Sequence, residues 1–467
     1  MFVLNLAAPA PPSGAPVVLL AEVTRHLQAP AFSGTGEDAA ELIDLIRAAE
    51  TLKSALSGAQ ARWTAEFAAI RETEIAGFAT ASQGDRARRD VGAQIGLARR
   101  VSPRVGAQRV GLAKVLVNEM PATMDALRTG RIDEYQATLV VAETATLSRE
   151  HRQVVDAELA ARYGSMTPRQ ARAAAARIGY RLDAAQAIKR LRKGLGDRCV
   201  TLRPAPDTMS YLTALLPVAE GVAVYAALTR HAASATAAGD PRGKGALMVD
   251  ELVQRLVRPA DPGAQSTEMS ADSDDLEPVG DLTDGLPGLP AGVGVEIQLV
   301  MTDRTLLDGD VEPAILTGYG PIPAPLARHL VRTADPRTRT WVRRLYADPG
   351  GGRLINADST RRLFSHAARQ FLVARDQVCR TPWCGATIQH ADHTRPHARG
   401  GPTDPDNGAG LCAGCNQTKE QPGWISVADA EGGITTVTPT GHRYRSRSPD
   451  APQSESWARL PTAARSA

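Results

Sequence analysis

The sequence predicts a mainly α-helical protein, with a helical N-terminal domain that includes a small β hairpin and a small C-terminal domain built around cysteines. Apolar residues recur at steps of three and four from about residue 40 to 195, which is the period of amphipathic helices. Alanine is abundant and aromatic residues make up only 4% of the 467 residues, which favours helices over a β-sandwich. Four of the five cysteines lie between Cys379 and Cys415, which indicates a local site.

The first long helix is expected from Glu41 to Ile70. Its apolar residues are Leu42, Leu45, Ala49, Leu52, Leu56, Ala59, Trp63, Phe67 and Ile70. We expect this stripe to face the core, which is the usual role of such a pattern. Further helices are expected in the segments VGLAKVLVNEM, PATMDALRTG, IDEYQATLVVAETA and TPRQARAAAARIGYRL. The last of these begins with Thr167 as a plausible N-cap and Pro168 at the first helical position.

The helical pattern is interrupted at CVTLRPAPDTMSYLTALLP, where apolar and polar residues alternate on both sides of a Pro-Ala-Pro-Asp turn. This segment predicts a small β hairpin, and we expect Cys199 at its start to be a small core residue. Two helices follow, in AEGVAVYAALTRHA and GALMVDELVQRLV. The segment VGVEIQLVMT predicts a strand because it alternates and contains β-branched residues.

Changes in composition divide the chain into six segments. They are a disordered N-terminus with a first helix (1–39), a helical domain (40–257), an acidic flexible linker (258–292), a strand, turn and helix connector (293–350), the cysteine-containing domain (351–425), and short strands with a disordered tail (426–467). No apolar run is long enough to cross a membrane, and the N-terminus lacks the basic start of a signal peptide. We therefore expect a cytoplasmic protein without a membrane partner.

The cysteines form two pairs, Cys379-x4-Cys384 and Cys412-x2-Cys415. Four thiolates at such spacings satisfy a closed, tetrahedral structural Zn²⁺ site, although two chance pairs or redox-active thiols are alternatives. An arginine-rich helix is expected just before the first pair, and its basic residues are Arg361, Arg362, Arg369 and Arg375. Its charge is explained equally well by a solvated face or by contacts to phosphate groups.

The segment between and after the pairs carries a recognisable order of residues. Its members are Asp392, His393, Pro396, Gly400, Gly401, Thr403, Asp406, Asn407, Leu411, Cys412, Cys415, Asn416 and Lys419. This order resembles the signature of the HNH nucleases, DH-x-x-P…GG-x-T…DN…L-C-x-x-C-N-x-x-K, which fold as a ββα-metal motif. From about residue 40 to 447 the chain resembles the actinobacterial HNH-signature proteins with an N-terminal helical domain of unknown function, also called the thirteen-E-twelve repeat family. The helical part carries no assigned chemistry in that family.

The resemblance implies an endonuclease that hydrolyses DNA phosphodiester bonds, and the residue types suit this chemistry. An imidazole titrates near neutral pH, so His393 can act as the general base towards water. Asp392 and Asn416 are hard oxygen donors suited to a catalytic Mg²⁺ or Mn²⁺. Neighbouring residues of a strand point to opposite sides, so Asp392 and His393 can share the site only if the strand bends or ends there.

The resemblance also implies that Asn407 holds the loop that aims the His393 ring. Gly400 and Gly401 would allow a tight turn between two short strands. Arg395, Arg399 and Lys419 are candidate phosphate contacts, with simple surface charge as the alternative. Two neighbouring histidines, His390 and His397, and Trp424 have simpler expectations: solvated or structural histidines, and a tryptophan packed on the zinc module.

A different class of function remains open. The zinc module can instead be a nucleic-acid or partner-binding unit without cleavage, with the helical domain as the main functional part. An association with a mobile element is compatible with this alternative. Self-association through the helical domain is compatible with either function. The Asp392-His393 pair favours the nuclease, because a purely structural zinc loop has no need of it.

Overall fold

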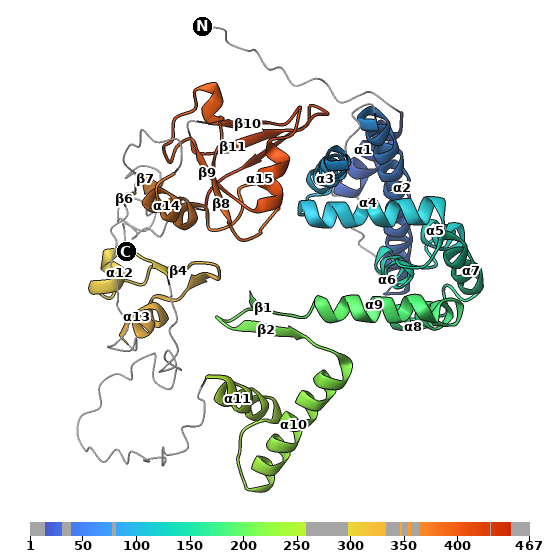
Figure 1. Cartoon of the computed structure of the whole chain (residues 1–467), viewed down its shortest axis with the longest axis horizontal. Helices are drawn as coiled ribbons and strands as arrows, with labels where there is room; N and C mark the ends of the chain where they lie inside the picture. The colour runs from blue at the N-terminus through green and yellow to red at the C-terminus, as the bar shows by residue number, and fades with distance from the viewer. Residues whose placement is uncertain are drawn as a thin grey trace. The chain divides into compact units, whose positions relative to one another are not determined.

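The computed structural model describes residues 15–29, 39–76, 81–257, 298–332, 346–347, 354–355, 364–429 and 431–449. The predicted fold class is confirmed, because these residues form mainly helices with small sheets (Figure 1). They divide into two compact units. Unit 1 contains Met1–Leu191, Val378–Pro402 and Asp406–Arg447, and unit 2 contains Arg192–Gln377, Thr403–Pro405 and Ser448–Ala467. No helix among the described residues is long and apolar enough to cross a membrane.

The N-terminal part is helical, as predicted for residues 40 to 195. Its helices are α1 (Ala15–Gln28), α2 (Ala39–Ala76), α3 (Ala81–Ala98), α4 (Pro103–Asn118), α5 (Pro121–Arg128), α6 (Glu134–Thr144), α7 (Arg149–Ala160), α8 (Pro168–Leu182) and α9 (Ala184–Gly196). The predicted start of α8 is confirmed: the Thr167 side chain accepts from the Gln170 amide, and Pro168 occupies the first turn. The core of this helical part includes Leu116, Leu127, Val140 and Leu159, each almost fully buried.

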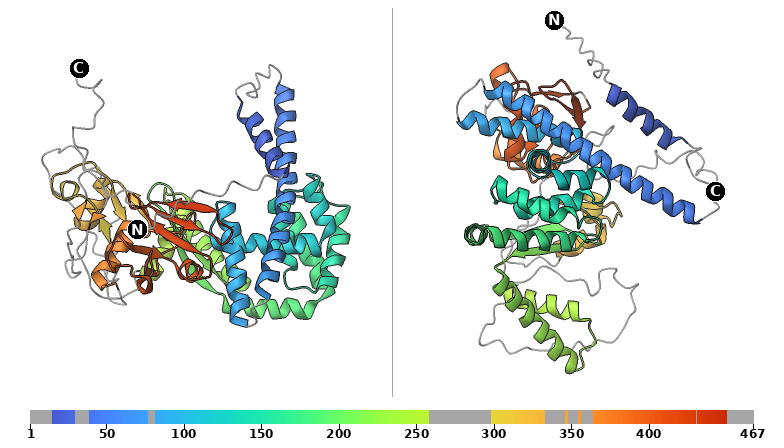
Figure 2. Two further views of the ribbon diagram at one scale, coloured as in Figure 1. Left: turned by 90° about the horizontal axis from the view of Figure 1, so that it is seen from above. Right: turned by 90° about the vertical axis from the view of Figure 1, so that its right-hand side faces the viewer.

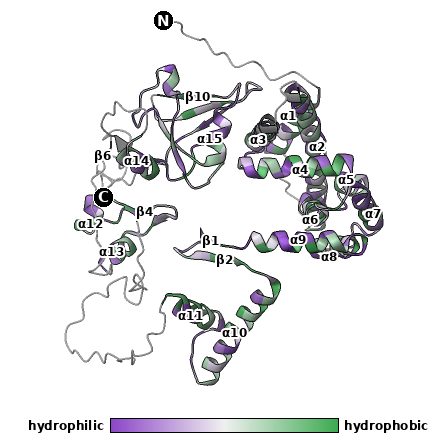
Figure 3. Ribbon diagram, in the orientation of Figure 1, coloured by the Kyte–Doolittle hydropathy of each residue, from purple (hydrophilic) through white to green (hydrophobic). Residues whose placement is uncertain are grey.

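Helix α2 forms as predicted, but the expected core-facing stripe is wrong for most of its residues, and only Leu56, Ala59 and Phe67 of it are half-buried. Its buried face consists of the small residues Ser54, Gly58, Ala61, Thr64, Ala65 and Ala68. The larger Leu42, Leu45, Leu52, Trp63 and Ile70 are exposed, and the mixed hydropathy of α2 is visible in Figure 3. The physical reason is close helix packing. A Cβ at Gly58 would lie 3.4 Å from the Arg128 Cα, so only small residues fit between α2 and α5.

A buried polar network joins α5 to α7. The Asp156 carboxylate, 2% exposed, accepts hydrogen bonds from the Ala122 amide at 2.7 Å and the Thr123 amide at 2.8 Å. These are the free N–H groups in the first turn of α5, so Asp156 caps that helix from a distant element. The Thr123 hydroxyl also donates to Asp156 at 2.6 Å and contacts the Tyr163 hydroxyl at 2.6 Å. Every member of the network is therefore satisfied, as a buried polar cluster requires.

This network predicts a loss of stability at high pH. Burial raises the pKa of Tyr163 from 10.0 to about 12. Between these values the unfolded chain releases the phenolic proton and the folded chain keeps it, so the stabilisation present below pH 10 is lost as pH rises towards 12. A shift of two units corresponds to about 3 kcal/mol. Chemical denaturation of the full chain across this range should show a steeper loss for wild type than for Tyr163→Phe, and parallel curves would contradict the prediction.

Unit 2 begins with the predicted hairpin, formed by β1 (Cys199–Pro204) and β2 (Ser210–Leu215), which pair in antiparallel register. All the residues of both strands are exposed, so the prediction that Cys199 is a core residue is wrong. Alternation of apolar and polar residues gives a two-stranded ribbon one apolar face, but it does not ensure that another element packs on that face. The two predicted helices follow as α10 (Val218–Ala237) and α11 (Lys244–Val257).

The rest of unit 2 contains short elements. They are β3 (Leu299–Val300), α12 (Asp303–Leu307), β4 (Ala314–Leu316), β5 (Gly320–Ile322), α13 (Ala324–Arg332), β6 (Tyr346–Ala347), β7 (Leu354–Ile355) and α14 (His366–Asp376). The strand predicted in VGVEIQLVMT lies outside the described residues up to residue 297. The acidic segment 258–292 and the chain before residue 15 also lie outside them. Arg361 and Arg362 also lie outside them. Arg375, on α14, pairs at 2.7 Å with the fully buried Asp376, so its charge is used within the fold.

The C-terminal part of unit 1 is a compact α/β module. It contains β8 (His390–His393), the 3-10 turn η2 (His397–Arg399), β9 (Gly408–Leu411), α15 (Ala413–Lys419), β10 (Ile425–Ala428), β11 (Ile434–Val437) and β12 (Arg443–Ser446). Strands β8 and β9 form one antiparallel pair, and β10, β11 and β12 form a separate sheet. This part of the chain is drawn in orange to red in Figure 2. The buried Arg380 guanidinium donates to the Gly432 carbonyl at 3.0 Å, which ties the segment before β8 to this sheet.

Candidate functional site

The four clustered cysteines meet at one point. Their sulfur atoms all lie within 4.8 Å of one another, with 3.8 Å between Cys384 and Cys412 and 3.6 Å between Cys384 and Cys415. Tetrahedral Zn²⁺ with Zn–S bonds of about 2.3 Å requires sulfur atoms about 3.8 Å apart. No disulfide joins them. The donor set therefore fits a structural zinc ion, and the cluster could hold one.

Local backbone geometry places these thiols. Cys412 is the N-cap of α15, and its sulfur accepts from the Cys415 amide at 3.4 Å. The first pair lies on a turn that closes through a hydrogen bond from the Cys379 amide to the Ala386 carbonyl at 2.8 Å. Hydrogen bonding from Cys384 lowers the pKa of the Cys379 thiol to about 7. The hydrogen bonds among the four sulfur atoms also lower the pKa of Cys412 and raise the pKa of Cys384 and Cys415, so zinc binding must release the protons of the latter two thiols.

Asp392 and His393 lie at the end of β8. Neighbouring residues of a strand can share a site where the strand ends, so this position is compatible with a shared site. The strand stops at His393, and the next residue, Thr394, donates its amide to the Asn407 carbonyl at 2.7 Å. Asp392 stays partly exposed, while His393 is only 8% exposed. The His393 Nδ1 lies 3.8 Å from the Asp392 Oδ1. Burial lowers the pKa of His393 below its ordinary value, with the charge of Asp392 opposing the shift. The imidazole is therefore held neutral near pH 7, the form that can accept a proton.

The loop between β8 and β9 is pinned by Asn407, which is 8% exposed. Its Oδ1 accepts from the Arg395 amide at 2.8 Å, and its Nδ2 donates to the carbonyls of Arg395 at 3.0 Å and Pro402 at 2.7 Å. The loop is longer than the tight turn expected between the strands. Gly401 instead permits a close approach, because a Cβ there would lie 2.0 Å from the Arg395 carbonyl oxygen.

Replacing Asn407 by alanine should loosen this loop. Three hydrogen bonds disappear and the partly buried Arg395 amide loses its acceptor, which costs roughly 2–3 kcal/mol. Hydrogen exchange at the Arg395 amide should accelerate and the unfolding free energy of the chain should fall. Asn407→Asp is the companion variant. It keeps the acceptor for that amide but places a carboxylate oxygen against the two carbonyl oxygens, so it should keep the amide protected while still lowering stability. Equal protection of the amide in wild type and Asn407→Ala would refute the role of this side chain.

Helix α15 brings Asn416 and Lys419 to the same region as β8. The Asn416 Oδ1 is buried and has no hydrogen-bond partner among the described residues. A buried acceptor of this kind can be satisfied by an ordered water or by a bound ion. The Lys419 Nζ lies 3.2 Å from the Asp392 carboxylate and also contacts Glu420. The site thus contains a partly exposed carboxylate, an unsatisfied amide oxygen and a neutral imidazole.

The other predicted residues lie around this centre. His390, His397, Arg395 and Arg399 are exposed. The His397 ring lies 5.8 Å from the His393 ring, in an edge-to-face arrangement. The Arg395 guanidinium donates to the Arg399 carbonyl at 2.8 Å, so part of its hydrogen-bonding capacity holds the loop. Trp424 packs against Ala93 and Leu97 of α3, a contact that the sequence did not reveal.

The fold and the site define a two-part class of protein, in which a mainly helical domain is followed by a ββα module with a four-cysteine cluster. Residues 53–376 match the family described as a domain of unknown function, DUF222, and residues 377–421 match the family described as HNH endonuclease. The chain therefore belongs to the DUF222 family and carries an HNH endonuclease domain, which confirms the resemblance found in the sequence. Neither a curated protein nor a solved structure matches the chain.

Proposed function

We propose that the chain is an endonuclease that hydrolyses DNA phosphodiester bonds with a divalent metal ion. The observation that carries this proposal is the buried Asn416 Oδ1, which has no hydrogen-bond partner within the part of the chain that the structure describes, on the residue that follows Cys415 of the cysteine cluster. Amide and carboxylate oxygens are the donors that Mg²⁺ and Mn²⁺ prefer. Asp392, on the adjacent β8, supplies the carboxylate.

In this proposal each side chain has a separate task. Asp392 and Asn416 hold the catalytic Mg²⁺ or Mn²⁺, which supplies Lewis-acid stabilisation of the scissile phosphate. His393 accepts a proton from the attacking water, and its burial keeps the ring neutral for this role. Asn407 acts through the loop rather than on the substrate. It fixes the backbone that follows His393 and so limits the positions of the ring.

Three basic side chains are proposed to contact the substrate backbone. Arg399 is exposed at the end of η2, and Arg395 lies on the same loop. Lys419 is close enough to Asp392 to reach a phosphate held beside that carboxylate. Cations placed in this way position a duplex without reading its sequence.

We further propose that zinc at the four cysteines is structural. The cluster uses four thiolates and leaves no position open for substrate. Because Asn416 directly follows Cys415, the zinc site fixes the start of α15 and with it the orientation of Asn416. The proposed domain arrangement places this nuclease at 351–425, after the helical domain 40–257, the linker 258–292 and the connector 293–350.

The role of Asn416 is tested by metal dependence. With Asn416→Ala, the Mn²⁺ concentration that gives half-maximal plasmid cleavage should rise at least roughly tenfold, because one oxygen ligand is lost. Asn416→Asp keeps an oxygen donor at the same position and should retain metal-dependent cleavage. An unchanged Mn²⁺ requirement in Asn416→Ala would remove Asn416 from the proposed metal site.

A second candidate is a zinc-stabilised module that binds nucleic acid without cutting it. The Asp392–Lys419 ion pair favours this candidate, because the ammonium group already neutralises the carboxylate. Tight duplex binding without cleavage under Mg²⁺, Mn²⁺ and other divalent ions would support it.

Self-association through the helical domain is also proposed. Large apolar residues are exposed along α1 and the first half of α2, among them Leu19, Val23, Ile43 and Ile46. Exposed apolar faces of this kind are typical of interaction surfaces. Sedimentation of the full chain would show a dimer or higher species if the proposal holds. A cytoplasmic location remains a prediction from the sequence.

A further inference from the structure

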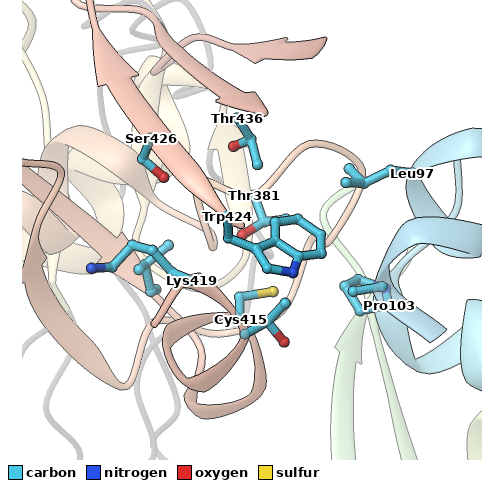
Figure 4. Close-up of a pocket in the computed structure, with 11 residues that line it drawn as sticks. Leu97, Pro103, Thr381, Cys415, Lys419, Trp424, Ser426 and Thr436 are labelled. Atoms are coloured by element: carbon cyan, nitrogen blue, oxygen red, sulfur yellow. The ribbon is translucent and has the colours of Figure 1, made fainter. Parts of the chain in front are cut away.

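Helix α3 of the helical domain is docked on the nuclease module within unit 1. The Trp424 Nε1 donates to the Asp90 Oδ1 at 2.6 Å, and both side chains are buried. The indole lies between the module and α3 (Figure 4), where it packs with Ala93 and Leu97. The space left at this junction is about 30 Å³, which holds little more than a water molecule. The junction is therefore a closed contact and not a ligand pocket.

A hydrogen-bond network fixes this contact. The Asp90 carboxylate also accepts from Arg71 of α2 at 2.9 Å and from the Gln94 Nε2 at 3.0 Å. The Gln94 Oε1 in turn accepts from the Thr440 hydroxyl at 2.8 Å. Arg89 reaches the other side of the module and donates to Gln417 of α15. Three side chains of α3 thus bind the module at three separate points, so the end of α3 is held in a fixed position beside it.

The α3–α4 helix pair is strongly basic. Residues 81–118 contain eight Lys or Arg and two Asp, a net charge of +6, whereas the whole chain has +3. Much of this charge is neutralised locally. Arg99 and Arg109 both pair with Glu134, and Lys114 pairs with Glu72.

Two arginines at the turn between α3 and α4 are not neutralised. Arg100 and Arg104 are exposed, and neither makes an ion pair within the described part of the chain. Leu97 and Pro103, which flank Arg100, line the junction with α15 together with Lys419. Arg100 and Arg104, together with the exposed Arg89 earlier in α3, are therefore cations on the part of the α3–α4 pair that contacts the nuclease module.

Both arginines occupy positions that the backbone does not favour. Arg100 has φ of +55° at the C-terminus of α3, where the Val101 amide bonds to the Gly96 carbonyl and the Arg100 amide to the Leu97 carbonyl. Glycine is the usual residue at this position of such a motif. Arg104 lies in the first turn of α4, where the helix dipole disfavours a cation. Local stability therefore does not explain either arginine.

We infer that the α3–α4 corner, residues 99–104, is a second surface for the phosphate backbone of the DNA substrate, contacted by Arg100 and Arg104. This inference rests on the proposed nuclease function. Duplex DNA carries one negative charge per about 1.7 Å of its axis, so a bound duplex extends well beyond a single active site. Two of the three cations proposed for the module also serve within the fold, because Lys419 pairs with Asp392 and Arg395 donates to the Arg399 carbonyl, so part of their charge is already used. The corner supplies the additional positive charge at a fixed position.

The test measures duplex binding by the zinc-loaded full chain. A fluorescein-labelled duplex is titrated in Ca²⁺, over a range of NaCl concentrations, with wild type and with Arg100→Asn/Arg104→Gln. Asparagine tolerates positive φ, so the turn should keep its conformation. Loss of two phosphate contacts should lower the slope of log affinity against log salt by about 1.8, and the affinity roughly 30-fold near physiological salt.

The matched control is Arg169→Gln/Arg177→Asn on α8. Both arginines are exposed and lack a salt bridge among the described residues, and Arg169 follows a helix-initiating proline as Arg104 does. The control should bind as wild type does. An unchanged salt slope in the corner variant, or an equal loss in the control, would overturn the inference.

The two proposals fail in different ways. A wild-type chain that binds duplex through the corner, but does not cleave DNA with any of the metals tested, would contradict the proposed nuclease and leave the inference about the corner intact. A wild-type chain that cleaves DNA, with a corner variant that binds equally well, would contradict the corner alone.

Discussion

Replacing His393 by alanine is expected to reduce the rate of DNA cleavage by about 10²–10⁴-fold, the usual contribution of a positioned general base. The ring is 8% exposed at the end of β8, and its burial keeps it neutral near pH 7. Without the imidazole, the attacking water must lose its proton to solvent. The site should still bind metal and DNA. Single-turnover cleavage of supercoiled plasmid measures this rate, and duplex binding should change little.

The matched control is His397→Ala. The centre of this second imidazole lies 5.8 Å from that of His393, and its side chain is exposed on η2. Its removal should leave the rate within a few-fold of wild type. If His393→Ala cuts as fast as wild type, or if His397→Ala shows the larger loss, the general base has been assigned to the wrong residue.

Replacing Cys415 by serine is expected to release zinc and unfold the module that contains α15. Structural zinc contributes an apparent 10–16 kcal/mol, by order of magnitude, to small zinc-dependent folds. Hydrophobic burial cannot replace such a contribution here, because the cysteines themselves make up much of the small core around Leu411 and Ile434. We expect loss of bound zinc, loss of protease resistance in 378–447, and complete loss of cleavage.

Cys199→Ser provides the control for this substitution. Cys199 is exposed at the start of β1 and distant in sequence from the cluster, so the variant should retain its zinc, its melting behaviour and its activity. Measurement of zinc content by metal analysis separates the two variants directly. A Cys415→Ser protein that is folded and active without zinc would show that the cluster is not structural.

The elements that the sequence predicted well depend on local patterns. The α8 cap at Thr167 and Pro168 and the two cysteine pairs are recognisable from neighbouring residues alone. The same is true of Asp392 and His393 at a strand end, because the motif order is contiguous in the chain. These features needed no knowledge of distant partners.

The features that were missed depend on contacts between distant residues. The buried face of α2 is set by close packing against another helix, which selects small residues such as Gly58 over the larger apolar ones. The partner of Trp424 is Asp90, 334 residues away, and nothing near Trp424 in the chain identifies it. Lys419 was assigned to phosphate from its charge, and its ion pair with Asp392 appears only when α15 is placed beside β8.

Metal-dependent cleavage of supercoiled plasmid by the zinc-loaded full chain tests the central claim most directly. The reaction is run without added metal and with Mg²⁺ or Mn²⁺, for wild type beside His393→Ala. We predict nicked and linear products only for wild type and only with added metal. The absence of cleavage by wild type under every metal, or equal cleavage by His393→Ala, would contradict the account.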